Sequence, residues 1–180
     1  MFYLKYLWAL FFQYRRDFVK KAAIFVTFII INTFLIISTA IAQEQTSKAE
    51  KGINQTSALL ENKEIILKLF HEVINLRNVS YFDQVYVPNA IDHSAWPGQA
   101  PGTAGIKQAV KEFLETFSEL KVTVEDVIAE GNKVATRETW KGTHKSTGKA
   151  GSGSVIHIFW IQDGKVTEEW SRGWDWADKL

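Results

Sequence analysis

The chain has 180 residues, of which 46% are hydrophobic and 23% charged, as is ordinary for a globular protein. Its 21 basic residues balance 20 acidic ones, so the net charge gives no reason to expect nucleic acid as a partner. The absence of Cys excludes disulfides, thiol nucleophiles and thiolate metal sites.

The first 42 residues have the pattern of an export segment. Residues 22–42 contain no charged side chain and follow the basic stretch "RRDFVKK" at 15–21. Ala40 and Ala42 offer the small residues that signal peptidase recognises, which predicts cleavage after residue 42. The apolar run also approaches the roughly 20 residues that span a bilayer, so an uncleaved membrane anchor is the alternative. In both cases the rest of the chain lies outside the cytoplasm, as a periplasmic, secreted or membrane-anchored domain. The Arg pair also resembles a twin-arginine motif, which leaves the export route open.

Residues 43–56 are polar and predict a linker, so the folded domain is expected at 57–180. Apolar residues recur at helical spacing from Leu59, after a possible cap at Ser57, and predict a helix of about five turns. A short helix over 80–86 and another amphipathic helix over 106–118 follow, separated by a loop rich in Gly and Pro.

Beyond residue 120 the apolar period changes from 3.6 to 2. The stretches "KVTVEDVIAEGNKVATRETWKGTH" and "SVIHIFWIQDGKVTEEWS" each contain two alternating runs around a Gly-containing turn. Helices followed by hairpins predict an α+β domain with an antiparallel sheet and the helices packed on one of its faces.

Three separated blocks carry a resemblance to a known family: "AIDHSAWPGQAPGTAGIKQAVKEF", "VEDVIAEGNKVATRETWKGTH" and "IHIFWIQDGKVTEEW". In order and spacing they resemble the SnoaL-like polyketide cyclase and ester cyclase families of the nuclear transport factor 2-like superfamily. The resemblance implies a cone, or α+β barrel, in which a curved sheet wraps around about three helices and encloses an apolar pocket. It also implies a homodimer. Function is a separate matter, because this fold hosts several kinds of enzyme and many proteins that only bind.

Strand alternation sorts the polar candidates into faces. Arg137 and Thr139 share one face of their strand, and His157 and Phe159 share one face of the next. The resemblance implies that these faces, together with Ser171 on the last strand, look into the cone.

The family's cyclases close rings by aldol chemistry, using an aspartate on the last strand as acid and base with support from a pocket histidine. His157 matches that histidine, but Ser171 aligns with the aspartate. A hydroxyl group does not act as a base near neutral pH unless a neighbouring group deprotonates it. This alignment therefore removes the group that the reaction needs. Two residues are candidates to replace the missing aspartate. Asp175 would reach the pocket if Gly173 forms a bulge that shifts the strand face, and His157 would itself act as the base in the other case. The alternative is that His157 and Ser171 only shape the pocket.

Other candidates carry weaker signals. His93 and Trp96 flank the Gly/Pro loop and resemble residues at the pocket mouth. Arg137 in a strand interior binds an anionic ligand or pairs with an acidic side chain such as Glu169. No His or Asp pair has the spacing of metal ligands on one element, so neither a metal nor another cofactor is predicted.

Three functional hypotheses therefore remain. The first is an exported protein that binds a small hydrophobic or aromatic molecule and has lost the cyclase reaction. The second is an enzyme of the same fold, of the cyclase, isomerase or lyase type, that transfers a proton alpha to a carbonyl with His157 and Asp175. The third is a dimerisation module that uses exposed Trp side chains.

Overall fold

The computed structural model describes residues 2–174, which divide into two compact units, Met1–Ile53 and Asn54–Leu180. The helical elements are α1 (Phe2–Leu69), the π-helical η1 (Phe70–Asn75), the 3₁₀ turn η2 (Val79–Tyr81), α2 (Phe82–Val85) and α3 (Gly102–Thr116). The strands are β1 (Tyr86–Asp92), β2 (Phe117–Glu130), β3 (Lys133–His144), β4 (Ala150–Gln162) and β5 (Lys165–Arg172).

The first unit contains the part of helix α1 that ends at Ile53. Its apolar stretch is solvent-exposed, and among the described residues it belongs to the one helix that is long and apolar enough to cross a membrane. A signal sequence near the N-terminus has the same properties, so this feature is weak evidence for a membrane span. The segment at 43–56 is helical, so the predicted helix start at Ser57 is wrong. The physical reason is that the segment contains no Pro and is rich in residues that tolerate a helix, with an i,i+4 ion pair between Glu44 and Lys48.

The second unit is built on an open sheet of five strands in the order β1-β5-β4-β3-β2. Neighbouring pairs from β2 to β5 are antiparallel, as the alternating sequence predicts, whereas β1 pairs with β5 in parallel. Pro88 lies in β1, which is an edge strand where the missing N–H is tolerated. The turn between β4 and β5 places Asp163 and Gly164 at positive φ, in agreement with the predicted Asp-Gly hairpin.

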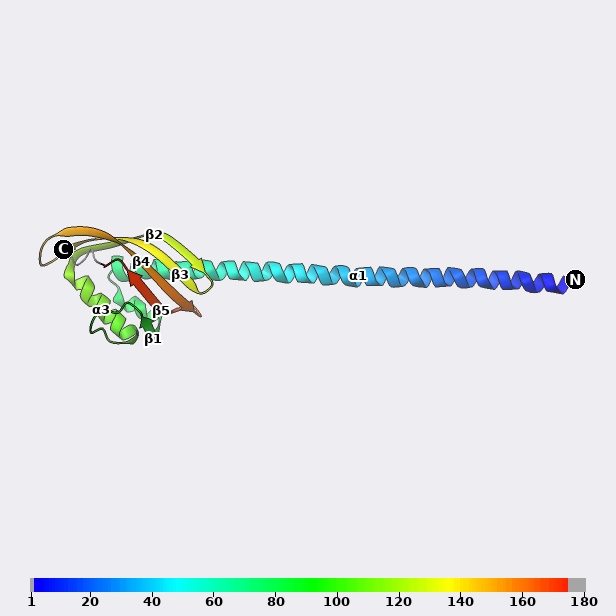
Figure 1. Ribbon diagram of the computed structural model, residues 1–180, viewed down its shortest axis with the longest axis horizontal. Helices are drawn as coiled ribbons and strands as arrows, with labels where there is room; N and C mark the ends of the chain where they lie inside the picture. Colours follow the sequence, from blue (N-terminus) through cyan, green and yellow to red (C-terminus); the bar gives the residue numbers. More distant parts are fainter. Residues whose placement is uncertain (1, 175–180) are drawn as a thin grey trace. The chain divides into compact units, whose positions relative to one another are not determined.

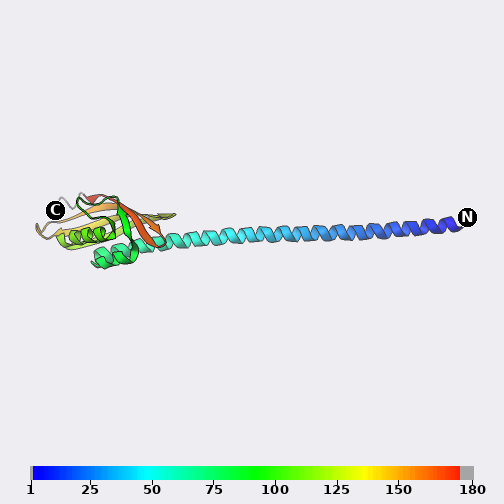
Figure 2. The same cartoon turned by 90° about the horizontal axis from the view of Figure 1, so that it is seen from below.

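The core lies between the concave face of the sheet and the helices. Figures 1 and 2 show the sheet arching over α3 and the helical segments that precede β1. Phe117 and Phe159 are fully buried, as is Ile66 near the end of α1. The predicted α+β cone with a curved sheet around N-terminal helices is therefore confirmed. Each fully buried side chain of this size contributes about 1.5–3 kcal/mol to folding.

The register between strands decides which side chains face the core. Thr136 on β3 lies opposite His157 on β4, which in turn lies opposite Ser171 on β5. Residues directly opposite each other share a face, so these three positions point into the cone. Arg137 lies opposite Ile156, on the outer face.

Candidate functional site

The helices and the concave face of the sheet enclose a cavity of about 80 Å³. Because one water molecule needs about 10–15 Å³ by the same measure, the cavity has room for a few water molecules or a small ligand. Most of the wall is apolar and aromatic. The lining residues are Leu69, Phe70, Val73, Ile74, Phe82, Tyr86, Asp92, Ser94, Trp96, Gln99, Ile106, Ala109, Val110, Phe113, Trp140, His157, Phe159, Glu169, Ser171 and Trp174.

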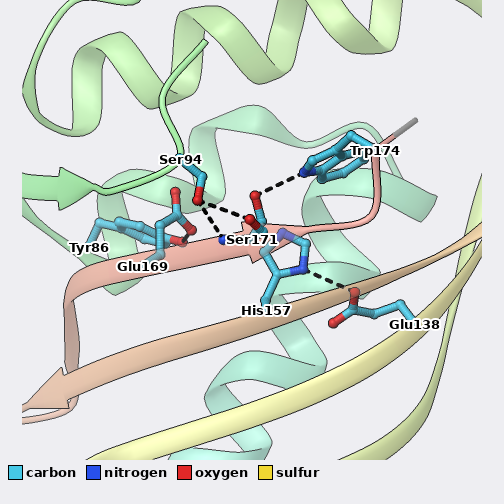
Figure 3. A network of polar contacts seen from close by, with 7 residues as sticks. All are labelled: Tyr86, Ser94, Glu138, His157, Glu169, Ser171 and Trp174. Carbon is cyan, nitrogen blue, oxygen red and sulfur yellow. Dashed lines mark hydrogen bonds and ion pairs between the residues drawn. The ribbon is translucent and has the colours of Figure 1, made fainter. Parts of the chain in front are cut away.

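His157 is a buried polar residue of the lining, with 8% of its surface exposed. Its ring stacks on Phe159, with an interplanar angle of 7°, and meets the edges of Phe70 and Trp174. Its Nδ1 lies 3.0 Å from Oε2 of Glu138, which is on the same face of the neighbouring strand but does not line the cavity (Figure 3). With Nδ1 taken, Nε2 is the ring nitrogen available to a ligand.

Glu169 on β5 provides a carboxyl group to the same cavity. The pKa of Glu169 is raised from its ordinary value of 4.5 to about 7, mainly by burial and also by the charge of the nearby Asp92. A hydrogen bond from the Tyr86 hydroxyl, 2.6 Å from Oε2, and the charge of His157 act in the opposite direction and lower it. Burial and the Glu169 carboxyl raise the pKa of Tyr86 well above 10, so the phenol remains a donor at physiological pH. Glu169 therefore exchanges its proton near neutrality, as a general acid or base should.

The loop after β1 closes one side of the cavity with a polar network. The backbone N–H of Ser94 and the amide of Gln99 donate to the two carboxylate oxygens of Asp92, at 2.8 and 2.9 Å. Ser94 Oγ also accepts from the backbone N–H of Ser171 and donates to its carbonyl (Figure 3). The Ser171 hydroxyl accepts a hydrogen bond from the indole of Trp174 at 2.9 Å. Both carboxylate oxygens of Asp92 are thus occupied, whereas Glu169 accepts from one donor among the described residues.

The structure places four of the predicted site residues in the cavity wall: His157, Ser171, Trp96 and Phe159. Their roles remain predictions. Asp175, the alternative catalytic residue, lies outside the described residues.

Three predicted pocket residues do not line the cavity. Arg137 is on the outer face with 49% of its side chain exposed, and it pairs with Asp126 at 2.7 Å instead of with Glu169 or a ligand. Thr139 shares that outer face, because alternation places it with Arg137. The third is His93, which stacks on Trp170 and is outside the cavity lining.

Sequence reasoning missed Glu138 and Tyr86 as members of the site, and it did not include Asp92 or Glu169 among the predicted site residues. The signal for Glu138 was present in the sequence. Val134 and Trp140 share its strand face, and this face is more apolar than the face that contains Arg137. A carboxylate among such neighbours is expected to be buried and to have a specific partner.

The cavity can bind an uncharged molecule and move protons on it. Asp92 and Glu169 provide acidic groups, and the lining within residues 2–174 contains no Lys or Arg. An anionic ligand would meet carboxyl groups without a compensating cation, which disfavours it. An apolar molecule with a carbonyl group fits better, because the imidazole and a protonated carboxyl group provide a base and a hydrogen-bond donor.

Comparisons with known proteins agree with this fold. Residues 64–180 match the family model described as SnoaL-like polyketide cyclase. A search of curated proteins finds no match to the chain.

Solved structures add further relatives by fold. A putative polyketide cyclase from Bacillus cereus is 26% identical, with a TM-score of 0.57 over 63% of this chain and 74% of that one. TsrD from Streptomyces laurentii is 21% identical, with a TM-score of 0.58 over 63% of this chain and 88% of that one. AclR from Streptomyces galilaeus, described as a putative hydroxylase, is 23% identical, with a TM-score of 0.56 over 64% of this chain and 90% of that one. Because these names differ in activity, the shared fold does not identify the reaction.

Proposed function

Because this chain belongs to the SnoaL-like polyketide cyclase family, we propose that its cavity binds a small, uncharged, mainly apolar carbonyl compound and transfers a proton at the carbon next to the carbonyl. The observation that carries the proposal is that His157 and Glu169 line one apolar cavity, and that burial raises the pKa of Glu169 to about 7. Perturbed titratable groups in a cavity are typical of acid–base sites.

In this mechanism His157 is the base and Glu169 the acid. The carbonyl oxygen of the ligand accepts a hydrogen bond from protonated Glu169, which makes the neighbouring C–H more acidic. Nε2 of His157 takes the proton from carbon, and the C–H electron pair forms the enol as Glu169 gives its proton to oxygen. Returning both protons completes an isomerisation or exchange, whereas attack of the enol carbon on a second carbonyl closes a ring. Proton transfer by a positioned side chain contributes about 10²–10⁴-fold.

The proposal is tested by solvent-deuterium exchange into 2-indanone, an aromatic ketone with acidic hydrogens beside its carbonyl. The full chain in a mild non-ionic detergent is expected to accelerate the exchange, and His157→Ala is expected to lose about 10²–10⁴-fold of the rate. Arg137→Ala is the matched control, because that side chain is on the outer face. An equal rate with wild-type protein, with His157→Ala and with detergent alone would reject catalysis.

Binding without catalysis is the second candidate, favoured by the alignment of Ser171 with the family's catalytic aspartate. In that case 2-indanone shifts the NMR signals of cavity residues such as Trp96 without isotope exchange. An anionic probe of similar shape, indane-2-carboxylate, is expected to bind more weakly than 2-indanone because the lining provides acidic groups and, within residues 2–174, no Lys or Arg.

Export of the domain is also proposed. The support is the basic stretch at 15–21 followed by an apolar helix in the first unit. Protease treatment of intact cells or spheroplasts that produce the full chain is expected to digest a tag at the C-terminus. Protection of the tag until the cytoplasmic membrane is lysed would contradict export. The apparent mass of the exported protein distinguishes cleavage after residue 42 from a retained anchor.

A further inference from the structure

Glu138 is a buried carboxylate that the proposed reaction does not use directly. It is 0% exposed, lies on β3 and does not line the cavity. Oε2 contacts Nδ1 of His157 at 3.0 Å, whereas Oε1 has no hydrogen-bond partner among the described residues. Burying a carboxylate with one oxygen unpaired is costly, and an apolar side chain of similar volume would avoid that cost. At this position, a carboxylate provides the contact with His157, and an apolar side chain would not.

We propose that Glu138 is a positioning residue that holds His157 in the tautomer with its proton on Nδ1, so that Nε2 presents its lone pair to the cavity. The proposal takes the Glu138 carboxyl group as ionised, and the tautomer then follows from its contact with Nδ1. The catalytic consequence rests on the proposed function, in which Nε2 is the base.

The argument begins with the donors and acceptors. An ionised carboxylate only accepts hydrogen bonds, so Nδ1 of a neutral His157 must donate to Oε2. The proton of a neutral imidazole is then on Nδ1, and Nε2 carries the lone pair. The opposite tautomer would place two acceptors 3.0 Å apart.

The surrounding aromatic rings fix the orientation of the imidazole ring, which the carboxylate alone does not. Phe159 stacks on the imidazole at 5.5 Å between ring centroids, while the edge contacts with Phe70 and Trp174 are at 5.4 and 5.7 Å. These aromatic neighbours restrict the ring plane but offer no acceptor to choose the protonated nitrogen. Figure 3 shows Glu138 approaching the imidazole from β3, away from Glu169 and Ser171. Glu138 therefore sets the proton position, and the aromatic side chains set the orientation.

The test is NMR of ring-¹⁵N-labelled histidine in the full chain, held in detergent micelles at a pH where imidazole is neutral. Two-bond ¹H–¹⁵N correlations distinguish the two tautomers of each His. The chain has four His residues, and the signals of His157 are those lost in His157→Phe. The wild-type protein is expected to show His157 with Nδ1 protonated and Nε2 unprotonated. A proton on Nε2 in the wild-type protein would overturn the proposal.

Glu138→Met is the variant expected to remove this preference, because it keeps the volume and removes the acceptor. The His157 signals should then change to a mixture of tautomers or to Nε2–H. Glu168→Met is the matched control, since it removes the carboxylate that contacts the partly exposed His93 at 2.7 Å. It should leave His157 unchanged. Persistence of the single wild-type tautomer in folded Glu138→Met contradicts the proposal. Should this variant fail to fold, Glu138→Leu applies the same test, because it also removes the acceptor.

Exchange kinetics separate this inference from the proposed function. Glu138→Met is expected to lower kcat for 2-indanone exchange by at least about tenfold, within the range that a general base contributes, with little change in KM. The expected tautomer without any wild-type exchange would reject the proposed function and leave the positioning role intact. If the wild-type protein catalyses the exchange but His157 has its proton on Nε2, the positioning role alone is rejected.

Discussion

Replacing Glu169 with Gln tests whether burial of its carboxyl group carries the free-energy cost that its pKa implies. In the wild-type protein, the Tyr86 hydroxyl lies 2.6 Å from Oε2 of Glu169 and donates to it. The substitution keeps the size of the side chain and an oxygen that can accept this hydrogen bond, but the side chain no longer titrates. The pKa of Glu169 is raised from 4.5 to about 7 in the folded protein, with burial as the main cause. The folded state therefore binds the proton more tightly than the unfolded state does.

The magnitude follows from linkage between protonation and folding. At about 1.4 kcal/mol per pKa unit, the rise from 4.5 to about 7 corresponds to at most about 3.5 kcal/mol. Above pH 7 the carboxyl is ionised in both states, and the folded state bears the full cost. As the pH falls from 7 to 4.5, only the folded state takes up the proton, so this group makes folding more favourable. Below pH 4.5 both states are protonated and the cost has disappeared.

The assay is urea unfolding of the full chain in mild detergent, monitored by Trp fluorescence between pH 4.5 and 8.5. Glu169→Gln is expected to be more stable than wild-type protein at pH 8.5, by up to about 3.5 kcal/mol, and this advantage should shrink as the pH falls toward 4.5. Glu168→Gln is the control, because the neighbouring carboxyl is outside the cavity lining. A difference between Glu169→Gln and wild type that does not change with pH would refute the linkage argument.

Three further substitutions give distinct results. Tyr86→Phe removes the hydrogen bond that lowers the pKa of Glu169, so ¹³C NMR titration should place that pKa above the wild-type value. Asp92→Asn removes a charge that raises the pKa of Glu169, so the same titration should give a value below that of the wild-type protein. A pKa that shifts in the same direction in both variants would contradict this account. Arg137→Ala breaks an exposed ion pair with Asp126 and is expected to change the unfolding free energy by no more than about 1 kcal/mol. A loss of 2-indanone binding in Arg137→Ala would contradict its position on the outer face.

The fold was largely predictable because local periodicity carries much of the information about it. The change of apolar period after residue 120 separates helices from strands, and the Asp163-Gly164 turn joins the last two strands as expected. The parallel pairing of β1 with β5 was not predictable, because it joins residues 77–80 positions apart in the sequence. The continuity of α1 was missed for another reason: a polar stretch without an apolar period can still be helical.

The site was predictable only in part, because alternation groups the residues of one strand without saying which group faces inward. On β4 the inward group contains His157, as predicted. On β3 the resemblance favoured the group of Arg137, but the structure buries the group of Glu138. The apolar neighbours Val134 and Trp140 favoured the correct choice. The carboxyl pair of Asp92 and Glu169 depends on strand pairing and loop folding, which one sequence does not reveal.

The pH dependence of kcat/KM for deuterium exchange into 2-indanone tests most directly whether His157 and Glu169 act together. The rate with wild-type protein is expected to fall above pH 7 as Glu169 loses the proton that polarises the carbonyl. In Glu169→Gln that decline should disappear, and in His157→Ala exchange should be slow at every pH. A wild-type profile that stays flat through pH 7, or one that Glu169→Gln reproduces, would contradict the paired acid–base site.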